Sequence, residues 1–238
     1  MADESIYVSG AYIDSNPNYH VEDSSWKASK ILDILKKNKL DNQMGSICEI
    51  GCGVGEILVQ LQKGLSSSIS IEGYEISPQA YQLSLSRQNE NLKFYCEDLL
   101  LLDNHYDLML CIDVIEHVDD YLDFVRKLRD KAKYTLFHIP LDLSVQTVLR
   151  STPIQYVREK VGHIHYFTKD IAIAALLDSG YEIVDYQYTA GQLEISKSSL
   201  SKWLFWPRKL ITSINEDFGV RLLGGYSLLI LTKPRGQQ

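Results

Sequence analysis

The feature that most constrains this chain is a glycine-rich turn between an apolar segment and an amphipathic one. Residues 46–50 read Ser-Ile-Cys-Glu-Ile, which is typical of a short buried strand. The run Gly51-Cys52-Gly53-Val54-Gly55 follows at once, and apolar residues then recur with helical spacing. Glycine lets the backbone adopt conformations closed to other residues and pass close to a ligand. The turn therefore predicts either a ligand cradle or a tight turn that is purely structural.

Segments with strand and helix character alternate along most of the chain. Strands are expected at residues 46–50, 69–75, 92–96, 106–112, 133–139, 181–189 and 226–232. A helix from Trp26 to Asn38 precedes the first strand, with Ser24 or Ser25 as its cap, and Ser77 and Thr168 are expected to cap later helices. This alternation predicts an α/β fold with a doubly wound, mostly parallel sheet. Such sheets bind ligands at the carboxyl ends of their strands.

An acidic residue ends the second predicted strand. Glu75 follows Gly55 by 20 residues, and a carboxylate there can accept hydrogen bonds from two ribose hydroxyls. It can equally stabilise the start of the next helix. Together, the turn and the acid favour a nucleoside ligand. A nicotinamide dehydrogenase is disfavoured, because the third glycine comes one residue early for the dinucleotide fingerprint and Glu56 stands in its place.

Several ordered motifs resemble those of class I S-adenosylmethionine-dependent methyltransferases. Glu49–Gly55 resembles the family's first motif, in which an acid precedes G-x-G-x-G, and Gly73–Pro78 resembles the second. Cys96–Leu99 resembles the third, and Tyr106–Val118 resembles the fourth, ending in the D-V-x-E-H-V form of the small-molecule branch (methyltransferase types 11, 12 and 23). Gly162–Thr168 resembles the segment before the last large helix of that branch.

The resemblance covers about residues 26–190 and implies a cofactor, S-adenosyl-L-methionine, with S-adenosyl-L-homocysteine as by-product. It also implies a Rossmann-like sheet of seven strands in the order 3-2-1-4-5-7-6, the last strand antiparallel. The site residues that it implies are taken position by position from the motifs. The methionine part would be surrounded by Glu49, Gly51, Gly53 and Gly55, with Cys52 in the same turn. The ribose would be held by Glu75 and the adenine amine by Asp98, and the adenine ring would be flanked by Ile76 and Leu99. Asp113 would lie near the methyl group.

Histidines supply the candidate catalytic groups. His117 follows the fourth predicted strand and His138 ends the fifth, so both are candidate bases for an acceptor that must lose a proton. His117 has an equally good interpretation as a residue that caps the next helix. His163 and His165 have the spacing of neighbours on one face of a strand, but no carboxylate pattern accompanies them, so we predict no metal site and expect them to anchor a loop. Asp142 is a candidate wall of the acceptor site, although a turn residue is the stronger interpretation.

We expect a single domain over residues 1–238. Its parts are an irregular segment (1–25), a cofactor-binding core (26–190), a helical insertion or lid (191–224), and the last strand with a tail (225–238). Within the insertion, residues 197–209 mix basic and large aromatic side chains. That mixture favours a peripheral membrane contact or a lid over an apolar substrate, with a core-packing helix as the plainer alternative. The tyrosine-rich start (Tyr7, Tyr12, Tyr19) is a candidate cover for the pocket.

Composition narrows the function further. The formal charge of −7 argues against a broad nucleic-acid surface. No signal peptide or membrane-spanning run is visible, and the four cysteines have neither disulfide nor metal spacing, so a cytoplasmic location is expected. The leading hypothesis is a methyltransferase acting on an O, N or C atom of a small molecule, with an apolar molecule as a candidate. Alternatives are a catalytically silent cofactor-binding interaction protein and a nucleic-acid methyltransferase, the latter disfavoured because residues 112–115 lack the proline-aromatic run of amino-methylating enzymes.

Overall fold

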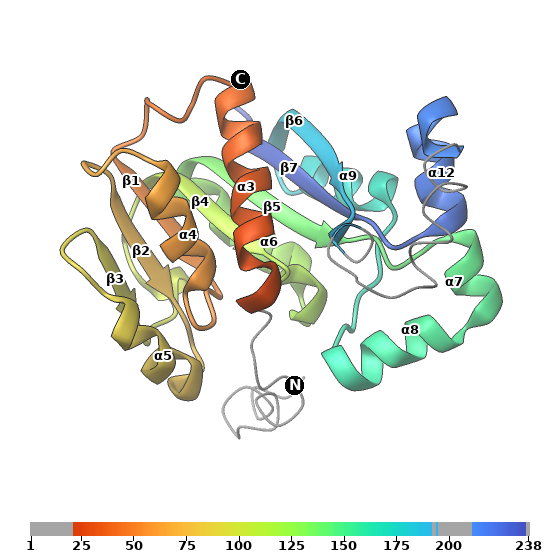
Figure 1. The fold of residues 1–238 in the computed structure, drawn as a ribbon, viewed down its shortest axis with the longest axis horizontal. Helices are drawn as coiled ribbons and strands as arrows, with labels where there is room; N and C mark the ends of the chain where they lie inside the picture. The colour runs from red at the N-terminus through yellow and green to blue at the C-terminus, as the bar shows by residue number, and fades with distance from the viewer. Residues whose placement is uncertain (1–20, 192–193, 195–210, 237–238) are drawn as a thin grey trace.

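The computed structural model describes residues 21–191, 194 and 211–236, which build a seven-stranded sheet with helices on both faces (Figure 1). The strand order is β3-β2-β1-β4-β5-β7-β6, which confirms the expected topology. The strands are β1 (Ser46–Ile50), β2 (Ser70–Tyr74), β3 (Leu92–Tyr95), β4 (Tyr106–Ile112), β5 (Ala132–Pro140), β6 (Tyr181–Thr189) and β7 (Ser227–Pro234). Their positions agree with the predicted ones to within two residues.

Strands β1 to β5 run parallel, and β7 is antiparallel to both of its neighbours, β5 and β6. The carboxyl ends of the five parallel strands therefore meet at one edge of the sheet. The chain passes from β3, on one side of β1, to β4 on its other side, so the strand order reverses between β1 and β4. That reversal point is where open α/β sheets bind ligands.

The helices divide between the two faces of the sheet. The α-helices are α3 (Val21–Lys37), α4 (Glu56–Gly64), α5 (Pro78–Ser84), α6 (Tyr121–Leu128), α7 (Val145–Arg150), α8 (Thr152–Tyr156), α9 (Lys169–Asp178) and α12 (Glu216–Leu223). Short 3-10 turns span Leu85–Arg87, Leu99–Leu101 (η2), Ile115–His117 (η3) and Arg129–Lys131, and a π-helical turn spans Val157–Val161. Apolar side chains of α3 and α4 share one core cluster with the sheet, whereas those of α6 and α9 share another on the opposite face (Figure 1).

Helix α3 begins earlier than predicted. It starts at Val21, so Ser24 lies buried within the helix and is not its cap. Acidic Glu22 and Asp23 occupy the first turn, where they complement the helix dipole, and two lysines occupy the last. Residues 21–25 are therefore helical, and the irregular segment expected for residues 1–25 does not extend that far.

Helix α9 is capped as predicted, with the Thr168 side chain accepting from Ile171 N. Its buried residues are Ala172, Ala175 and Leu176, whereas Ile171 is 46% exposed. The apolar run continues around the whole helix, so periodicity could not select the buried face.

The insertion before the last strand is helical where the structure describes it. Helix α12 begins at Asn215, whose side chain caps it by accepting from Phe218 N. The predicted lid or membrane contact at residues 197–209 and the tyrosines of the start (Tyr7, Tyr12, Tyr19) lie outside the described residues. Over the described part of the chain, no helix has both the length and the apolar character that crossing a bilayer requires.

Candidate active site at the carboxyl edge of the sheet

The carboxyl ends of the parallel strands gather the polar side chains that the sequence singled out. Glu49 lies near the end of β1, Glu75 directly follows β2, and Asp98 lies shortly after β3. Asp113 follows β4, and His138 lies near the end of β5. Five strands thus contribute one predicted residue each to the same edge.

The glycine turn after β1 requires glycine for steric reasons. Gly51, Gly53 and Gly55 have φ values of 67°, 54° and 78°, in the left-handed region that L-residues with side chains rarely adopt. A Cβ atom on Gly55 would lie 2.2 Å from the Phe94 ring, and one on Gly51 would lie 2.9 Å from Val114. Gly55 precedes α4 without a side-chain cap, so the turn leads directly into a helix N-terminus.

Glu75 ties this turn to β2. One carboxylate oxygen accepts from Gly53 N at 2.8 Å, and the other accepts from Ser77 N at 2.7 Å. The residue is only 8% exposed. Burial raises the pKa of Glu75, and the backbone donors of Ser77 and Gly53 oppose that shift. The Glu75 carboxylate therefore holds the conformation of the glycine turn at the carboxyl edge of the sheet.

Glu49 is a buried acid with an unsatisfied oxygen. It is 2% exposed, and its Oε2 atom has no hydrogen-bond partner among the described residues. Burial raises the pKa of Glu49, and the nearby Lys27 ammonium offsets this only in part. Cys52, in the turn above it, is half-buried, and burial raises the pKa of its thiol, which stays protonated at neutral pH.

The residues expected around an adenine ring lie in different environments. Asp98 is half-buried, and its Oδ1 atom accepts from Leu100 N at 2.9 Å to cap η2. Ile76, which follows Glu75 after β2, is 50% exposed. Leu99 is fully buried in the core cluster that includes Tyr74. Leu99 thus offers no side-chain surface in this structure, and its expected contact with the adenine ring stays a prediction.

Asp113 is the centre of a charged network at the tip of β4. Its two carboxylate oxygens lie 2.6 Å from His138 Nδ1 and 2.9 Å from Lys27 Nζ. Its backbone, at φ 53°, is left-handed, which aspartate tolerates better than most residues, and its N–H donates to His138 O. Burial alone would raise the pKa of Asp113, but His138 and Lys27 outweigh burial and hold it well below the usual range.

Lys27 reaches this network from α3. Its Nζ atom also lies 3.0 Å from Asp23, and its side chain is 13% exposed. Burial would lower the pKa of Lys27, but the carboxylates of Asp113 and Asp23 raise it instead. A long-range contact between a helix and a strand tip leaves no sequence motif, so no pattern indicated Lys27 beforehand.

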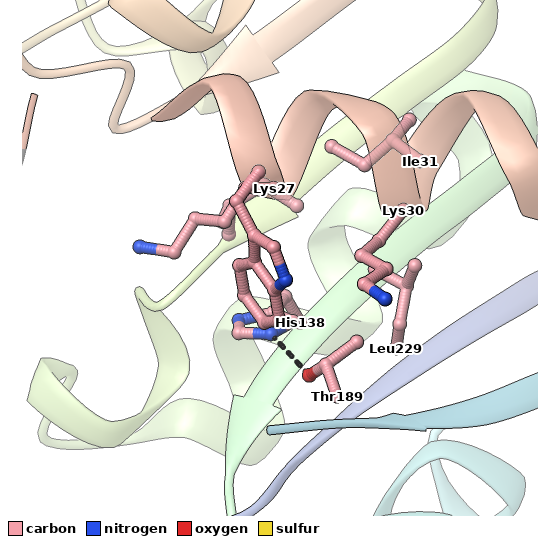
Figure 2. A pocket seen from close by; sticks show the side chains of 8 residues that line it. Lys27, Lys30, Ile31, His138, Thr189 and Leu229 are labelled. Atoms are coloured by element: carbon pink, nitrogen blue, oxygen red, sulfur yellow. Dashed lines mark hydrogen bonds between the residues drawn. The ribbon is translucent and has the colours of Figure 1, made fainter. Parts of the chain in front are cut away.

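His138 is buried beneath α3 rather than open at a pocket rim. It is 5% exposed, its Nδ1 faces Asp113, and its Nε2 lies 2.9 Å from Thr189 Oγ1. Figure 2 shows the ring below Lys27 and Lys30 of α3, with the contact to Thr189 dashed. A narrow crevice here is lined by Trp26, Lys27, Lys30, Ile31, Ile112, His138, Thr189 and Leu229. Because both ring nitrogens have partners, the geometry favours a residue that positions Asp113 over a base.

A second cluster lies after β4, where η3 meets the loop before α9. His117 Nδ1 is 3.0 Å from Gly162 O, and His163 Nδ1 is 2.7 Å from Asp142 Oδ2. The two rings pack edge to face, with centroids 5.0 Å apart. Burial, together with His163, lowers the pKa of His117 to about 4, so its ring is neutral at pH 7. Glu116, beside them, is fully buried.

His165 is not part of this cluster. Its Nε2 lies within 3.0 Å of the carbonyl oxygens of Val118 and Asp119, which agrees with the loop-anchoring role expected from the sequence. Asp142, interpreted chiefly as a turn residue, instead orients His163. Glu116 was visible within the D-V-x-E-H-V motif, but the motif does not reveal that its side chain turns inward.

A family model described as a methyltransferase domain matches residues 24–186, well over half of the chain. The chain belongs to the methyltransferase-domain family. The match includes the glycine turn, all the acids at the carboxyl edge, and both histidine clusters. The matched region ends within β6, before α12 and β7.

Relatives of this methyltransferase-domain chain are distant. Malonyl-[acyl-carrier protein] O-methyltransferase of Bacillus cereus is 29% identical over 104 residues, which make up 42% of this chain and 38% of the relative. The same enzyme of Bacillus anthracis matches equally. The matched stretch therefore spans about two fifths of the length of these curated relatives.

Solved structures resemble the chain over more of its length. Magnesium protoporphyrin IX methyltransferase from Synechocystis, solved with S-adenosylhomocysteine, has a TM-score of 0.60 at 17% identity, over 89% of this chain and 83% of that one. The cyclopropane synthase MmaA2 from Mycobacterium tuberculosis has a TM-score of 0.56 at 14% identity, over 84% and 82%. At these identities the likeness establishes the shared fold and no more.

Proposed function

We propose that this methyltransferase-domain protein binds S-adenosyl-L-methionine and transfers its methyl group to an oxygen, nitrogen or carbon atom of a small molecule. The observation that carries the proposal is the bridge from Glu75 to Gly53 N, which joins the two binding motifs into one unit. A glycine turn joined to an acid at the end of the next strand is an arrangement suited to a nucleoside with a polar tail. The structures of related fold that are solved with this cofactor or its product support the same choice.

The residues present fit that cofactor. The buried, unpartnered oxygen of Glu49 suits an ammonium group, because a buried acceptor without a donor carries a free-energy penalty of about 1–3 kcal/mol. The carboxylate of Glu75 retains lone pairs for ribose hydroxyls beyond its two backbone donors. Asp98 uses Oδ1 for the cap of η2 and keeps Oδ2 for the adenine amine, and exposed Ile76 can cover one ring face.

The bound cofactor supplies an activated methyl group, so the main task of the protein is alignment. Orientation can contribute about 7–11 kcal/mol in well-built systems. Asp113, held from both sides by Lys27 and His138, is a rigid wall near the transferring methyl. His138 positions Asp113, and neutral His117 remains the candidate base for an acceptor that must lose a proton. The printed name of the curated relatives specifies transfer to oxygen, which makes oxygen the first acceptor atom to test.

Calorimetric titration with S-adenosylhomocysteine, and separately with NADH, tests the proposal. We expect micromolar binding of the first and none of the second. Glu75→Gln should weaken binding at least tenfold, because it replaces the charged acceptor that also holds Gly53. Glu182→Gln, which changes a surface acid of β6 that pairs with Lys233, is the matched control and should bind normally. A folded protein that ignores S-adenosylhomocysteine would overturn the proposal.

A catalytically silent binding protein is the alternative that this titration leaves open. Incubation with S-adenosylmethionine and a protein-free extract of small molecules separates the two. Release of S-adenosylhomocysteine that depends on the extract supports transfer. Tight cofactor binding without any such release across acceptor classes would instead favour the silent protein.

A further inference from the structure

Three potential metal ligands meet after β4, where η3 lies against the loop before α9. Glu116 and His117 come from η3, directly after β4, and His163 comes from the loop before α9. Each offers one ligand atom, and these atoms lie within 4.8 Å of one another. A single ion with bonds of about 2.0–2.2 Å holds its ligand atoms at most about 4.4 Å apart. The three side chains would therefore draw together slightly to bind one ion.

Glu116 provides the independent reason to look for a ligand. The residue is fully buried, and neither of its carboxylate oxygens has a hydrogen-bond partner among the described residues. Buried carboxylates in proteins are normally paired, hydrogen-bonded or coordinated to metal. The residue is also held firmly, because its backbone carbonyl accepts from both Ile164 N and His165 N. The backbone of Glu116 is thus fixed beside the loop that carries His163.

The histidines are oriented as metal ligands usually are. His163 Nδ1 contacts the carboxylate of Asp142 at 2.7 Å, and His117 Nδ1 contacts the carbonyl of Gly162 at 3.0 Å. Both oxygens accept, so both Nδ1 atoms carry the hydrogen and both Nε2 atoms carry the lone pair. A histidine that donates its other N–H to a carboxylate or backbone carbonyl is the usual outer arrangement of a metal site.

We propose that Glu116, His117 and His163 bind a divalent transition-metal ion, with Zn²⁺ the best match to two imidazoles and one carboxylate. Three protein ligands leave a fourth position for a water or a substrate oxygen. The sequence alone led us to expect no metal, because the carboxylate that completes the set is separated from His163 along the chain. An ion that contacts an acceptor hydroxyl would lower the pKa of that hydroxyl. This catalytic role of the ion rests on the proposed function, whereas binding of the ion does not.

The test uses the full-length protein, stripped of metal with a chelator and dialysed. Calorimetric titration with Zn²⁺, with elemental analysis of the dialysed complex, should give one ion per chain. His163→Ala and Glu116→Gln should each weaken binding at least a hundredfold. Asp142→Asn, which alters only the partner of His163, should weaken binding by about 10–100-fold. His165 lies in the same loop but outside the cluster, so His165→Ala is the matched control and should bind Zn²⁺ like the wild type.

Co²⁺ provides a spectroscopic signal that these residues would not produce if their role were only structural. A tetrahedral or five-coordinate Co²⁺ site absorbs strongly in the visible, and that band should be present in the wild type and the His165→Ala variant and absent from His163→Ala. Circular dichroism and binding of S-adenosylhomocysteine verify that each variant is folded. If Glu116→Gln fails to fold, His163→Ala and Asp142→Asn carry the test.

Two results would overturn the metal site. One is a folded wild type that binds no Zn²⁺ in stoichiometric amount, which would mean that Glu116 is simply buried in its protonated form. The other is Zn²⁺ binding that survives both His163→Ala and Glu116→Gln. The two proposals fail separately: loss of S-adenosylhomocysteine binding with Zn²⁺ binding intact rejects the cofactor, and the reverse rejects the metal.

Discussion

The carboxyl edge of the sheet has two halves that are held together in different ways. In the half formed by β1, β2 and β3, carboxylates accept from backbone N–H groups. Glu75 accepts from Ser77 N, and Asp98 accepts from Leu100 N, both two residues further on. Glu75 also accepts from Gly53 N, 22 residues earlier. The two short-range contacts form as soon as the local backbone takes its shape.

In the half formed by β4 and β5, side chains hold other side chains that are distant in sequence. Asp113 contacts His138, 25 residues away, and Asp142 contacts His163, 21 residues away. His138 in turn contacts Thr189, 51 residues away. This half exists only when several elements have docked.

The difference predicts how each half responds to substitution. A carboxylate held by backbone donors can be removed while the backbone keeps its shape, so the loss falls mainly on the ligand. A carboxylate that neutralises buried groups leaves them uncompensated when it is removed. Substitutions in the second half should therefore affect stability first.

The largest effect is expected for Asp113→Ala. The change leaves Lys27, with a side chain 13% exposed, and His138, 5% exposed, without their shared partner. Breaking a buried charge pair in this way costs about 3–5 kcal/mol, and we expect about 3 kcal/mol because the Asp113 side chain is 29% exposed. Urea unfolding of both proteins measures the loss. A change below about 1 kcal/mol would remove the distinction between the halves.

The pH dependence of stability sharpens the same contrast. Because the folded pKa of Asp113 lies well below its unfolded value of about 4, its stabilising contribution is complete above that value. It is lost as the pH falls below 4 toward the folded pKa. The stability difference between the wild type and Asp113→Asn should therefore shrink as the pH falls below 4.

A smaller effect on stability is expected for Asp98→Ala in the other half. The substitution removes the cap of η2, which costs about 1 kcal/mol. Binding of S-adenosylhomocysteine should weaken about tenfold, because the adenine amine loses a charged acceptor. Asp103 is an exposed acid on the following turn, so Asp103→Ala is the control for both stability and binding. If Asp98→Ala destabilised the fold more than it weakened binding, the first half would resemble the second.

The smallest effect is expected where an ion pair belongs to neither half. Lys37 of α3 contacts Asp185 of β6 at 2.8 Å, with the lysine side chain 62% exposed. Solvent-exposed pairs contribute about 0–1 kcal/mol. Lys37→Ala should thus change the free energy of unfolding by less than about 0.5 kcal/mol in thermal or urea unfolding. A larger change would mean that ion pairing to α3 matters in itself, wherever the pair lies.

The same contrast explains what could be predicted from the sequence. Strand positions and the glycine turn with its acid follow from local signals: apolar runs, glycines that need a left-handed backbone, and an acid at a fixed distance. Strand order and the place of Asp98 came instead from the resemblance to the methyltransferase motifs. The burial of Leu99 could not be predicted, because position in a motif does not say which way a side chain points. The sequence of α9 is apolar on all sides and could not indicate which face is buried.

The second half could be predicted only in part. Asp113, His117 and His138 were identified as candidates, but the partners that define their chemistry were not. Lys27 belongs to a helix whose start was misplaced, and Glu116 has an ordinary place in its motif. Contacts such as these depend on how helices and loops dock on the sheet, and a single sequence carries no periodic signal for them.

The position of β7 has a consequence for the order in which the molecule is made. It is the last strand in chain order, yet it lies between β5 and β6, and its residues from Leu228 to Leu231 are at most 1% exposed. Among the described strands, β6 pairs with β7 alone. While residues 227–234 are still inside the ribosome, β6 has no partner and the edge of β5 is open. Leu229 pairs with His138 of β5. The half of the edge formed by β4 and β5 is therefore completed only after synthesis has passed β7, whereas the half formed by β1, β2 and β3 can form much earlier.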